Sequence, residues 1–164
     1  MTKFLLGVAI VAFTSFCGYI LTKKYRKRKL FFTQLNEFNE RFLSEISYYR
    51  RPIAEFASKY TYKGEFNEFL EKYFEYIDET PRFFEEVFAS EGFTFLTAEE
   101  KTVLRDYFSM LGKGNSASQQ AYFSSVKERL IKLKTEAEAA CKRYGDLYIK
   151  LGFLCGLLIL ILII

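Results

Sequence analysis

The chain carries an apolar segment near each end, one almost as long as the hydrocarbon core of a bilayer is thick and one shorter, and these two segments limit what it can fold into. Residues 4–21 carry no charge, and a helix of that length measures about 27 Å, close to the roughly 30 Å of a hydrocarbon core. Residues 151–164 are also uncharged and make about 21 Å of helix, while Lys150 before them can extend its ammonium group to the headgroups. We therefore expect transmembrane helices at residues 4–22 and 151–164, with a helical domain over residues 23–150 between them.

Each apolar segment has one alternative interpretation. The first could be a cleaved signal peptide, but no small-residue cleavage site follows it, whereas a basic cluster that resists translocation does. The second could be the buried core helix of a soluble fold, but it contains no charged, amide or hydroxyl side chain that could make a polar face. We expect both segments to stay in the membrane.

Six basic residues follow the first apolar segment and set the expected orientation. Cytoplasmic loops of membrane proteins carry an excess of Lys and Arg, so residues 22–150 are expected in the cytoplasm and both termini outside it. The same cations are candidate contacts for anionic lipid headgroups, worth about 1 kcal/mol each. They are Lys23, Lys24, Arg26, Lys27, Arg28 and Lys29. Because the cluster adjoins a membrane span, we expect membrane lipids and no nucleic acid as its partner.

Apolar residues recur every three or four positions in the central region, which predicts an all-α fold. On the first helix they are Phe31, Leu35, Phe38, Phe42, Ile46 and Tyr49. On the last helix the spacing is that of a heptad repeat, typical of a coiled coil, and it continues into the second span. This heptad seam consists of Phe123, Val126, Leu130, Leu133, Ala137, Ala140, Tyr144, Leu147, Leu151 and Leu154. The simplest packing pairs the long N- and C-terminal helices antiparallel as a stalk in a helical cytoplasmic bundle, with shorter helices at the far tip.

Proline, glycine and capping residues mark the shorter helices. Pro52 suits the first turn of a second helix, which ends near Gly64. Residues 65–79 form the expected third helix, and Thr80-Pro81 opens a fourth.

Two capping-box patterns follow. Thr97 with Glu100 opens a fifth helix that ends at Gly112. Ser116 with Gln119 opens the last helix.

The charge of the central region is uneven. Residues 65–91 carry nine acidic and two basic side chains, whereas residues 113–150 carry eight basic and four acidic ones. The acidic stretch is either the solvated face of two helices or an electrostatic docking surface for a basic protein. The candidate partner-binding residues are Glu68, Glu71, Glu75, Asp78 and Glu79. Of the six phenylalanines in this stretch, we expect most in a small aromatic core and some as exposed interface anchors.

Nothing in the sequence nominates a catalytic centre. The chain has no His, and the glycines near Gly112 do not form a phosphate-binding loop. Cys17, Cys141 and Cys155 lie far apart in the sequence, and the Glu99-Glu100 pair is expected on a helix surface. We therefore expect no enzymatic activity, no metal and no cofactor.

A pair of glycines lies in the second apolar segment. Gly152 and Gly156 form a G-x-x-x-G pattern, which lets two helices approach closely in lipid. The partner could be the first span of the same chain or a helix of another subunit.

Three short motifs occur along the chain in a set order. Glu45-Ile46-Ser47-Tyr48 precedes Pro52, Leu111-Gly112 precedes Gln119-Gln120, and residues 151–158 read LGFLCGLL. In this order, and with an apolar segment at each end, they resemble the stage III sporulation protein AB family of endospore-forming bacteria. The positions of this chain that match the family motifs include Glu45, Tyr48, Pro52, Gly112, Gln119 and Gln120.

The sequence departs from the family pattern at two positions. Arg51 stands where the family usually has Thr, and Asn115 stands where it has Asp. Asn can still cap a helix, so the structural role of that turn is compatible with the change.

The resemblance implies a non-enzymatic component of the transenvelope complex between mother cell and forespore, in the mother-cell membrane that faces the forespore. It also implies a cytoplasmic domain similar to the helical platform domains of type II secretion proteins. The implied partners are a secretion-type ATPase, the stage III sporulation protein AA, and other stage III sporulation membrane proteins; self-association into a homo-oligomer is left open. The alternative is a generic two-span helical adaptor or lipid-binding protein with no ATPase partner.

Overall fold

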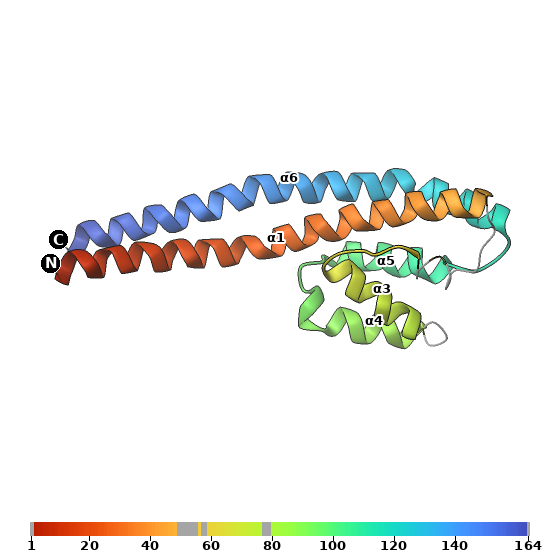
Figure 1. Cartoon of the computed structure of the whole chain (residues 1–164), viewed down its shortest axis with the longest axis horizontal. Helices are drawn as coiled ribbons and strands as arrows, with labels where there is room; N and C mark the ends of the chain where they lie inside the picture. The colour runs from red at the N-terminus through yellow and green to blue at the C-terminus, as the bar shows by residue number, and fades with distance from the viewer. Residues whose placement is uncertain (1, 49–55, 57–58, 77–79, 164) are drawn as a thin grey trace. The chain divides into compact units, whose positions relative to one another are not determined.

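The structure is a computed structural model that describes residues 2–48, 56, 59–76 and 80–163. Within these ranges, the side chains of residues 2–6, 47–48, 80–81 and 163 are not described. The described part is all-α and contains no strand (Figure 1), as the sequence predicted. Its helices are α1 (Thr2–Tyr48), α3 (Glu65–Glu75), α4 (Thr80–Ala89), the short 3-10 helix η2 (Glu91–Phe93), α5 (Ala98–Met110) and α6 (Ser116–Ile163).

The chain divides into two compact units. The terminal unit consists of residues 1–26 and 136–164, and the central unit consists of residues 27–135. Both long helices, α1 and α6, contribute residues to both units. The terminal unit therefore contains more of each helix than the spans expected at residues 4–22 and 151–164.

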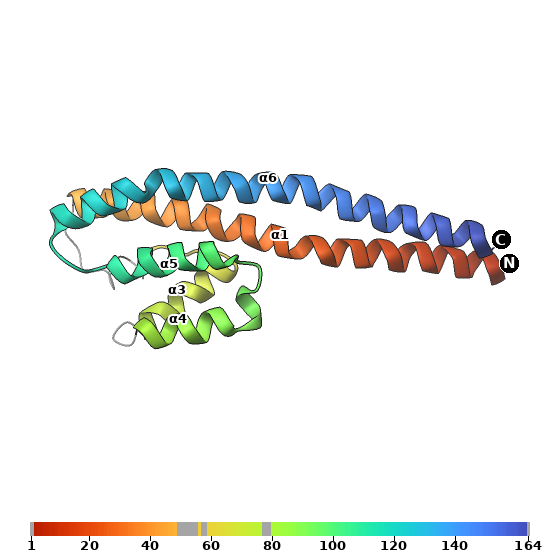
Figure 2. The same cartoon turned by 180° about the vertical axis from the view of Figure 1, so that it is seen from behind.

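In the terminal unit, the first part of α1 and the last part of α6 lie side by side and antiparallel (Figures 1 and 2). Gly7 lies against Leu160, and Gly18, three turns further along α1, lies against Tyr148. Higher residue numbers on α1 thus lie against lower residue numbers on α6, which is the antiparallel arrangement that the sequence predicted.

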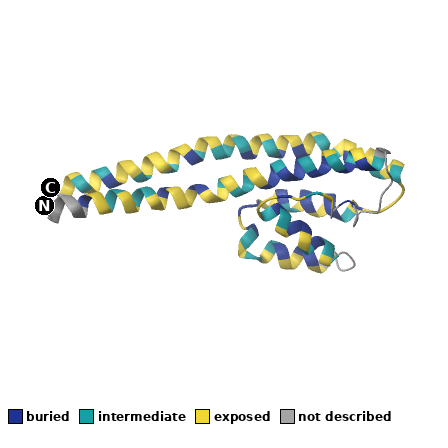
Figure 3. Cartoon of the chain, in the orientation of Figure 1, coloured by how far each residue is buried: buried dark blue, intermediate teal, exposed yellow. Residues whose placement is uncertain are grey.

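In the central unit, α1 buries one face that continues without a break for several turns (Figure 3). Phe31, Leu35, Phe38 and Phe42 are buried and Ile46 is half-buried, which confirms the predicted apolar face over these residues; Tyr49 lies outside the described part. Phe42 meets Phe123 of α6 edge to face, with ring centroids 4.9 Å apart. Aromatic pairs of this kind contribute about 0.5–1.5 kcal/mol beyond the area that they bury.

The three shorter helices α3, α4 and α5 complete the core of the central unit. On α3 the residues buried are Phe66, Phe69, Leu70 and Tyr73, at the i, i+3, i+4 and i+7 spacing of a single helix face. Phe69 lies 4.8 Å from Phe108 of α5, between ring centroids. The acidic stretch therefore supplies much of an aromatic core, as predicted.

Most of the six phenylalanines between residues 65 and 91 have the predicted fate. Phe66, Phe69, Phe83 and Phe84 are buried. Phe74 and Phe88 are half-buried. None of the six is fully exposed, so exposed aromatic anchors are not found among them.

One of the two predicted capping boxes is confirmed and the other is wrong. The Thr97 hydroxyl accepts a hydrogen bond from the Glu100 N–H at 3.3 Å, and a Glu100 carboxylate oxygen accepts one from the Thr97 N–H at 2.8 Å. Before α6, the cap is Asn115 rather than Ser116, because its Oδ1 accepts a hydrogen bond from the Ser118 N–H at 2.8 Å. The side-chain carbonyl of Asn115 therefore caps α6.

Two further boundary predictions have different outcomes. Gly112 follows α5 with a φ of 79°, a left-handed conformation that glycine adopts without strain, so the predicted stop is confirmed. The helix expected over residues 65–79 ends at Glu75, and residues 77–79 lie outside the described part. The helix expected from Pro52 to near Gly64 is described at residues 56 and 59–64; residues 56 and 59 are helical but residues 60–63 are not, so its expected extent to Gly64 is wrong.

Candidate functional site

The two helices of the terminal unit touch through glycine. A β-carbon added at Gly152 would lie 2.6 Å from the Thr14 carbonyl oxygen, and one at Gly156 would lie 2.8 Å from the Val11 α-carbon. From the other side, a β-carbon at Gly18 would lie 2.5 Å from the Tyr148 carbonyl oxygen. The G-x-x-x-G pattern thus lies against α1 of the same chain. Such close backbone approach is how helices associate in lipid, where no hydrophobic force drives them together.

This contact corrects the predicted heptad seam. Phe123, Leu130 and Leu133 in the central unit and Ala137 in the terminal unit are buried as predicted. Beyond Tyr144, the predicted positions Leu147, Leu151 and Leu154 are exposed.

The residues on the inner face of α6 in the terminal unit instead follow steps of four. Tyr148, Gly152, Gly156 and Leu160 all meet α1. Steps of four bring small residues onto one ridge, whereas a heptad places large residues there. Leu147, Leu151 and Leu154 are exposed because Gly152 and Gly156 occupy the contact with α1.

Large apolar side chains cover the outside of this helix pair. Among the described residues of the terminal unit, those exposed are Val8, Phe13, Phe16, Tyr19, Ile20, Leu21, Leu147, Ile149, Leu151, Phe153, Leu154, Leu158, Ile159, Ile161 and Leu162. A soluble protein rarely exposes so large a contiguous apolar patch.

One helix of the described part is long and apolar enough to cross a membrane. It is Ser116–Leu162, and only 11% of its most apolar 18-residue stretch is buried. The expected N-terminal span stays a prediction, and the side chains of its first residues, 4–6, lie outside the described part.

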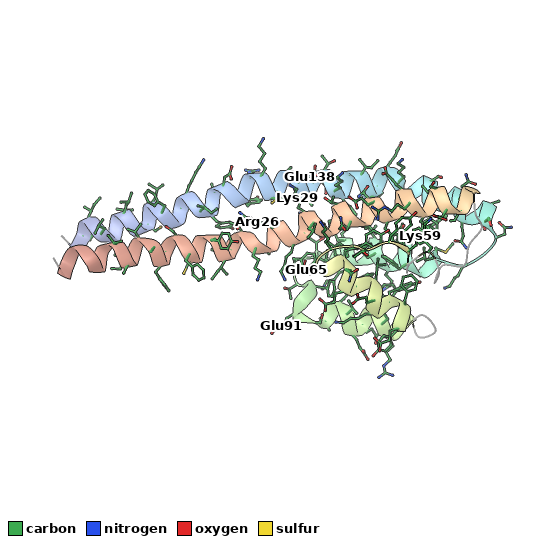
Figure 4. The ribbon with its side chains drawn as sticks, viewed as in Figure 1. Arg26, Lys29, Lys59, Glu65, Glu91 and Glu138 are labelled. Carbon is green, nitrogen blue, oxygen red and sulfur yellow. The ribbon has the colours of Figure 1, made fainter. Side chains whose placement is uncertain are left out.

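The structure divides the six predicted headgroup-binding cations into two groups. Lys23, Lys24, Arg26 and Lys29 are exposed. Lys27 instead forms an ion pair at 2.7 Å with Glu65, at the start of α3. Figure 4 labels Glu65. Arg28 binds Glu100 of α5, so two of the six cations hold the central unit together.

The Arg28–Glu100 pair is a buried ion pair that the sequence analysis missed. Arg28 Nε and Nη2 lie 2.7 and 2.6 Å from the same carboxylate oxygen, and Glu100 is 1% exposed. The other oxygen of Glu100 is held in the capping box with Thr97. The expected surface position is therefore confirmed for Glu99, which is exposed, and wrong for Glu100, whose buried carboxylate has a partner at each oxygen, as a buried charge must have.

The candidate docking residues on α3 lie on its outer face. Glu68, Glu71 and Glu75 are exposed. Lys72 pairs with Glu68 at 2.9 Å, and the Asn67 amide donates to Glu71 at 2.7 Å. Surface pairs of this kind contribute roughly 0–1 kcal/mol to stability, so the fold depends little on the acidic face. The other two candidates, Asp78 and Glu79, lie outside the described residues.

The motif residue Glu45 joins a polar cluster near the end of the described part of α1. Its buried carboxylate binds the Lys59 ammonium group and accepts a hydrogen bond from the Tyr60 hydroxyl at 3.0 Å. The hydrogen bond to Glu45 raises the pKa of Lys59 above its usual value. Arg41 lies over the Tyr60 ring, with Cζ 4.8 Å from the centroid. Glu45 therefore has a structural environment of its own, separate from the acidic face of α3.

The other motif positions are not gathered around Glu45. Gly112 forms the turn after α5, Gln119 is half-buried and Gln120 is exposed, both in the first turns of α6. The Tyr48 side chain and Pro52 lie outside the described part.

A row of buried polar groups on α1 joins it to α6 and to α5 within the central unit. The Asn36 amide donates to the carbonyls of Phe32 and Leu130 at 2.8 and 3.0 Å. The buried Tyr107 hydroxyl donates to Asn39 Oδ1 at 3.0 Å, and burial raises the pKa of Tyr107 well above its usual value. Two asparagines three residues apart, flanked by phenylalanines on the apolar face, were the signal that could have shown this row.

The remaining reactive groups are scattered. Among the described residues, no group of three or more His, Cys, Asp or Glu side chains could hold a metal ion. Cys17 and Cys155 are exposed and Cys141 is half-buried, and all three are free thiols.

The fold and surfaces together define an all-α protein with a helix suited to a membrane. The family model for stage III sporulation protein AB matches residues 3–164, nearly the whole chain, so this chain belongs to that family. It is therefore a sporulation protein, which confirms the family resemblance. No curated protein and no solved structure matches the chain.

Proposed function

We propose that this chain is a membrane-anchored, non-enzymatic platform of a sporulation transenvelope complex. Both helices of the terminal unit would cross the mother-cell membrane, with the termini outside the cytoplasm and the central unit inside it. The exposed apolar side chains of the terminal unit support the crossing, because lipid tails are the solvent that such a surface needs. The cations around residues 23–29 support the orientation.

The observation that carries the docking role is the division of α3 into two faces. Phe66, Phe69 and Tyr73 are buried in the core of the central unit, while Glu68, Glu71 and Glu75 face solvent. A face whose carboxylates are exposed and only lightly paired can bind a partner without weakening the fold. Complementary charge also speeds association and fixes its register. We propose that this face docks a partner with a basic surface.

The partner that the family resemblance implies is the secretion-type ATPase, the stage III sporulation protein AA. In this proposal the chain supplies no catalytic group. It holds the ATPase at the membrane, and the ATPase supplies the energy. Other stage III sporulation membrane proteins would then assemble around the same anchor.

Charge reversal on α3 tests the docking face. The full chain in nanodiscs would carry Glu68→Lys, Glu71→Lys and Glu75→Lys, and ATPase binding would be measured at low and high salt. The matched control reverses three exposed carboxylates elsewhere in the central unit, Glu40→Lys, Asp106→Lys and Glu128→Lys. We expect the unmodified chain and the control to bind tightly at low salt and more weakly at high salt.

The α3 variant should bind weakly at both salt concentrations. Equal loss in the control would show a general charge effect and remove the specific face. Binding that does not depend on salt concentration would show that the contact does not involve the carboxylates. No binding by the unmodified chain at either salt would reject direct docking and favour the adaptor or lipid-binding alternative.

A further inference from the structure

Three tyrosines from both helices stack together in the terminal unit. The Tyr25 ring of α1 lies 5.0 Å from the Tyr144 ring of α6, between centroids, at an angle of 23°. Tyr148, one turn further along α6, lies 6.1 Å from Tyr25 and 6.4 Å from Tyr144. All three rings are half-buried. Each therefore packs an apolar face and still reaches the surface, as tyrosines do at membrane interfaces.

Cations from both helices surround this tyrosine cluster. Lys24 Nζ lies 5.0 Å from the centroid of the Tyr25 ring, and Arg143 Cζ lies 5.6 Å from that of Tyr144. Arg26, which Figure 4 labels, has its Cζ 5.2 Å from the centroid of the Tyr19 ring on α1. Such contacts hold long cationic side chains beside aromatic rings.

These cations lack the carboxylate partners that their neighbours have. Lys23, Lys24, Arg26, Lys142 and Arg143 are all exposed. Among the residues that the structure describes, no carboxylate forms an ion pair with any of the five. Lys27 and Arg28, by contrast, are both occupied by carboxylates of the central unit. The five cations are therefore available to an anion from outside the chain.

Exposed apolar side chains adjoin the cluster on both helices. Tyr19, Ile20 and Leu21 precede it on α1. On α6, Leu147 lies between Tyr144 and Tyr148, and Ile149 and Leu151 follow Tyr148. A ligand that contacts the cations and these residues together must combine an anionic head with an apolar tail. That combination is an anionic phospholipid and not a free anion.

We propose that Tyr25, Tyr144 and Tyr148, with Lys23, Lys24, Arg26, Lys142 and Arg143, form a binding site for anionic phospholipid. The phosphate contacts cations from both helices, the tyrosines line the glycerol region, and the acyl chains lie along the apolar flanks. The site goes beyond the docking role and does not depend on the ATPase. It separates the basic cluster into cations that bind lipid and cations that hold the central unit together.

Lipid titration of the full chain in detergent micelles tests the site. The probe is phosphatidylglycerol with a fluorophore on its acyl chain, followed by fluorescence anisotropy. Two variants each remove two cations, Lys24→Gln with Arg26→Gln on α1, and Lys142→Gln with Arg143→Gln on α6. At about 1 kcal/mol per cation, which is about fivefold in affinity, each variant should bind roughly 25-fold more weakly.

The control removes the same charge from α6 in the central unit, through Arg129→Gln with Lys134→Gln. Its affinity should match that of the unmodified chain. Equal weakening in the control would show that net charge alone attracts the lipid, and an unaffected α6 variant would overturn a site shared by two helices.

Competition identifies the source of the phosphate. Unlabelled phosphatidylglycerol should displace the probe, whereas phosphatidylcholine and inorganic phosphate should not. Displacement by inorganic phosphate as effective as that by phosphatidylglycerol would overturn the lipid assignment. Displacement by phosphatidylcholine would overturn the requirement for an anionic headgroup.

Discussion

The two units of this chain hold their helices together in opposite ways. In the terminal unit, glycines bring the backbones of α1 and α6 into contact, and the large apolar side chains point outward. In the central unit, phenylalanines and tyrosines fill the space between helices, and the charged side chains are mostly outside. The first arrangement suits lipid, where burying apolar side chains gains nothing. The second suits water, where it supplies most of the stability.

The polar groups of the two units also differ in how their hydrogen bonds are satisfied. The central unit buries an Arg28–Glu100 ion pair and a row of asparagines, each with defined partners. In the terminal unit, Thr14 satisfies its hydroxyl locally, on the carbonyls of Ile10 and Val11 at 3.0 and 3.1 Å. A helix in lipid must satisfy its polar groups within itself or against a neighbouring helix.

The largest effect is expected in the aromatic core of the central unit. Phe69→Ala removes a fully buried ring that contacts Phe83, Phe93 and Phe108, and it should lower the free energy of unfolding by about 3–5 kcal/mol. Chemical denaturation of the full chain in micelles measures this. Phe74→Ala, at a half-buried ring, is the control and should cost clearly less.

Breaking the buried ion pair should cost about 3 kcal/mol, because Arg28→Ala leaves the Glu100 carboxylate buried without its cation. The same denaturation experiment applies. Lys29→Ala, which removes the exposed neighbouring cation, should change stability little. Equal losses in the two variants would contradict a structural role for Arg28.

Adding a methyl group to the glycine contact should affect the terminal unit alone. Gly152→Ala places a β-carbon against the Thr14 carbonyl, and overpacking of this kind costs about 1–3 kcal/mol. Gly145→Ala is the control, because its β-carbon would meet nothing within 4 Å. The control should leave helix association unchanged or strengthen it. Energy transfer between labels on the two helices, followed during denaturation in micelles, reports the difference.

The smallest effect is expected at the start of α6. Asn115→Ala removes the side chain that caps this helix, at a cost of about 1 kcal/mol. Ser116→Ala should cost only a few tenths of that amount, because the Ser116 hydroxyl is not the cap. Thermal unfolding of both variants measures the two losses of stability. A larger loss for Ser116→Ala than for Asn115→Ala would contradict the assignment of Asn115 as the cap.

Periodicity predicted the central unit well, since Phe31, Leu35, Phe38 and Phe42 bury the face that their spacing indicates. Periodicity failed on α6 beyond Tyr144, because the heptad pattern was assigned from large apolar residues, whereas glycines make the contact there. The ion pair of Glu100 was also not predicted. Its capping role was visible in the sequence, but its ion pair joins residues 72 positions apart.

The candidate docking face was partly visible in the sequence. The spacing of Phe66, Phe69 and Tyr73 predicts which side of α3 is buried, and so places Glu68 and Glu71 outside. The division of the basic cluster was not visible, because nothing local distinguishes Arg28 from Arg26. Their difference depends on which carboxylates the folded chain brings near.

The most direct test of the account is the membrane topology of the terminal unit. A variant with Cys17, Cys141 and Cys155 replaced by Ser would carry single cysteines through Thr2→Cys, Lys113→Cys or Ile164→Cys. We predict that a membrane-impermeant maleimide labels positions 2 and 164 in intact cells and labels position 113 only after permeabilisation. Labelling of position 113 in intact cells, or of only one terminus, would contradict a two-span anchor with a cytoplasmic central unit.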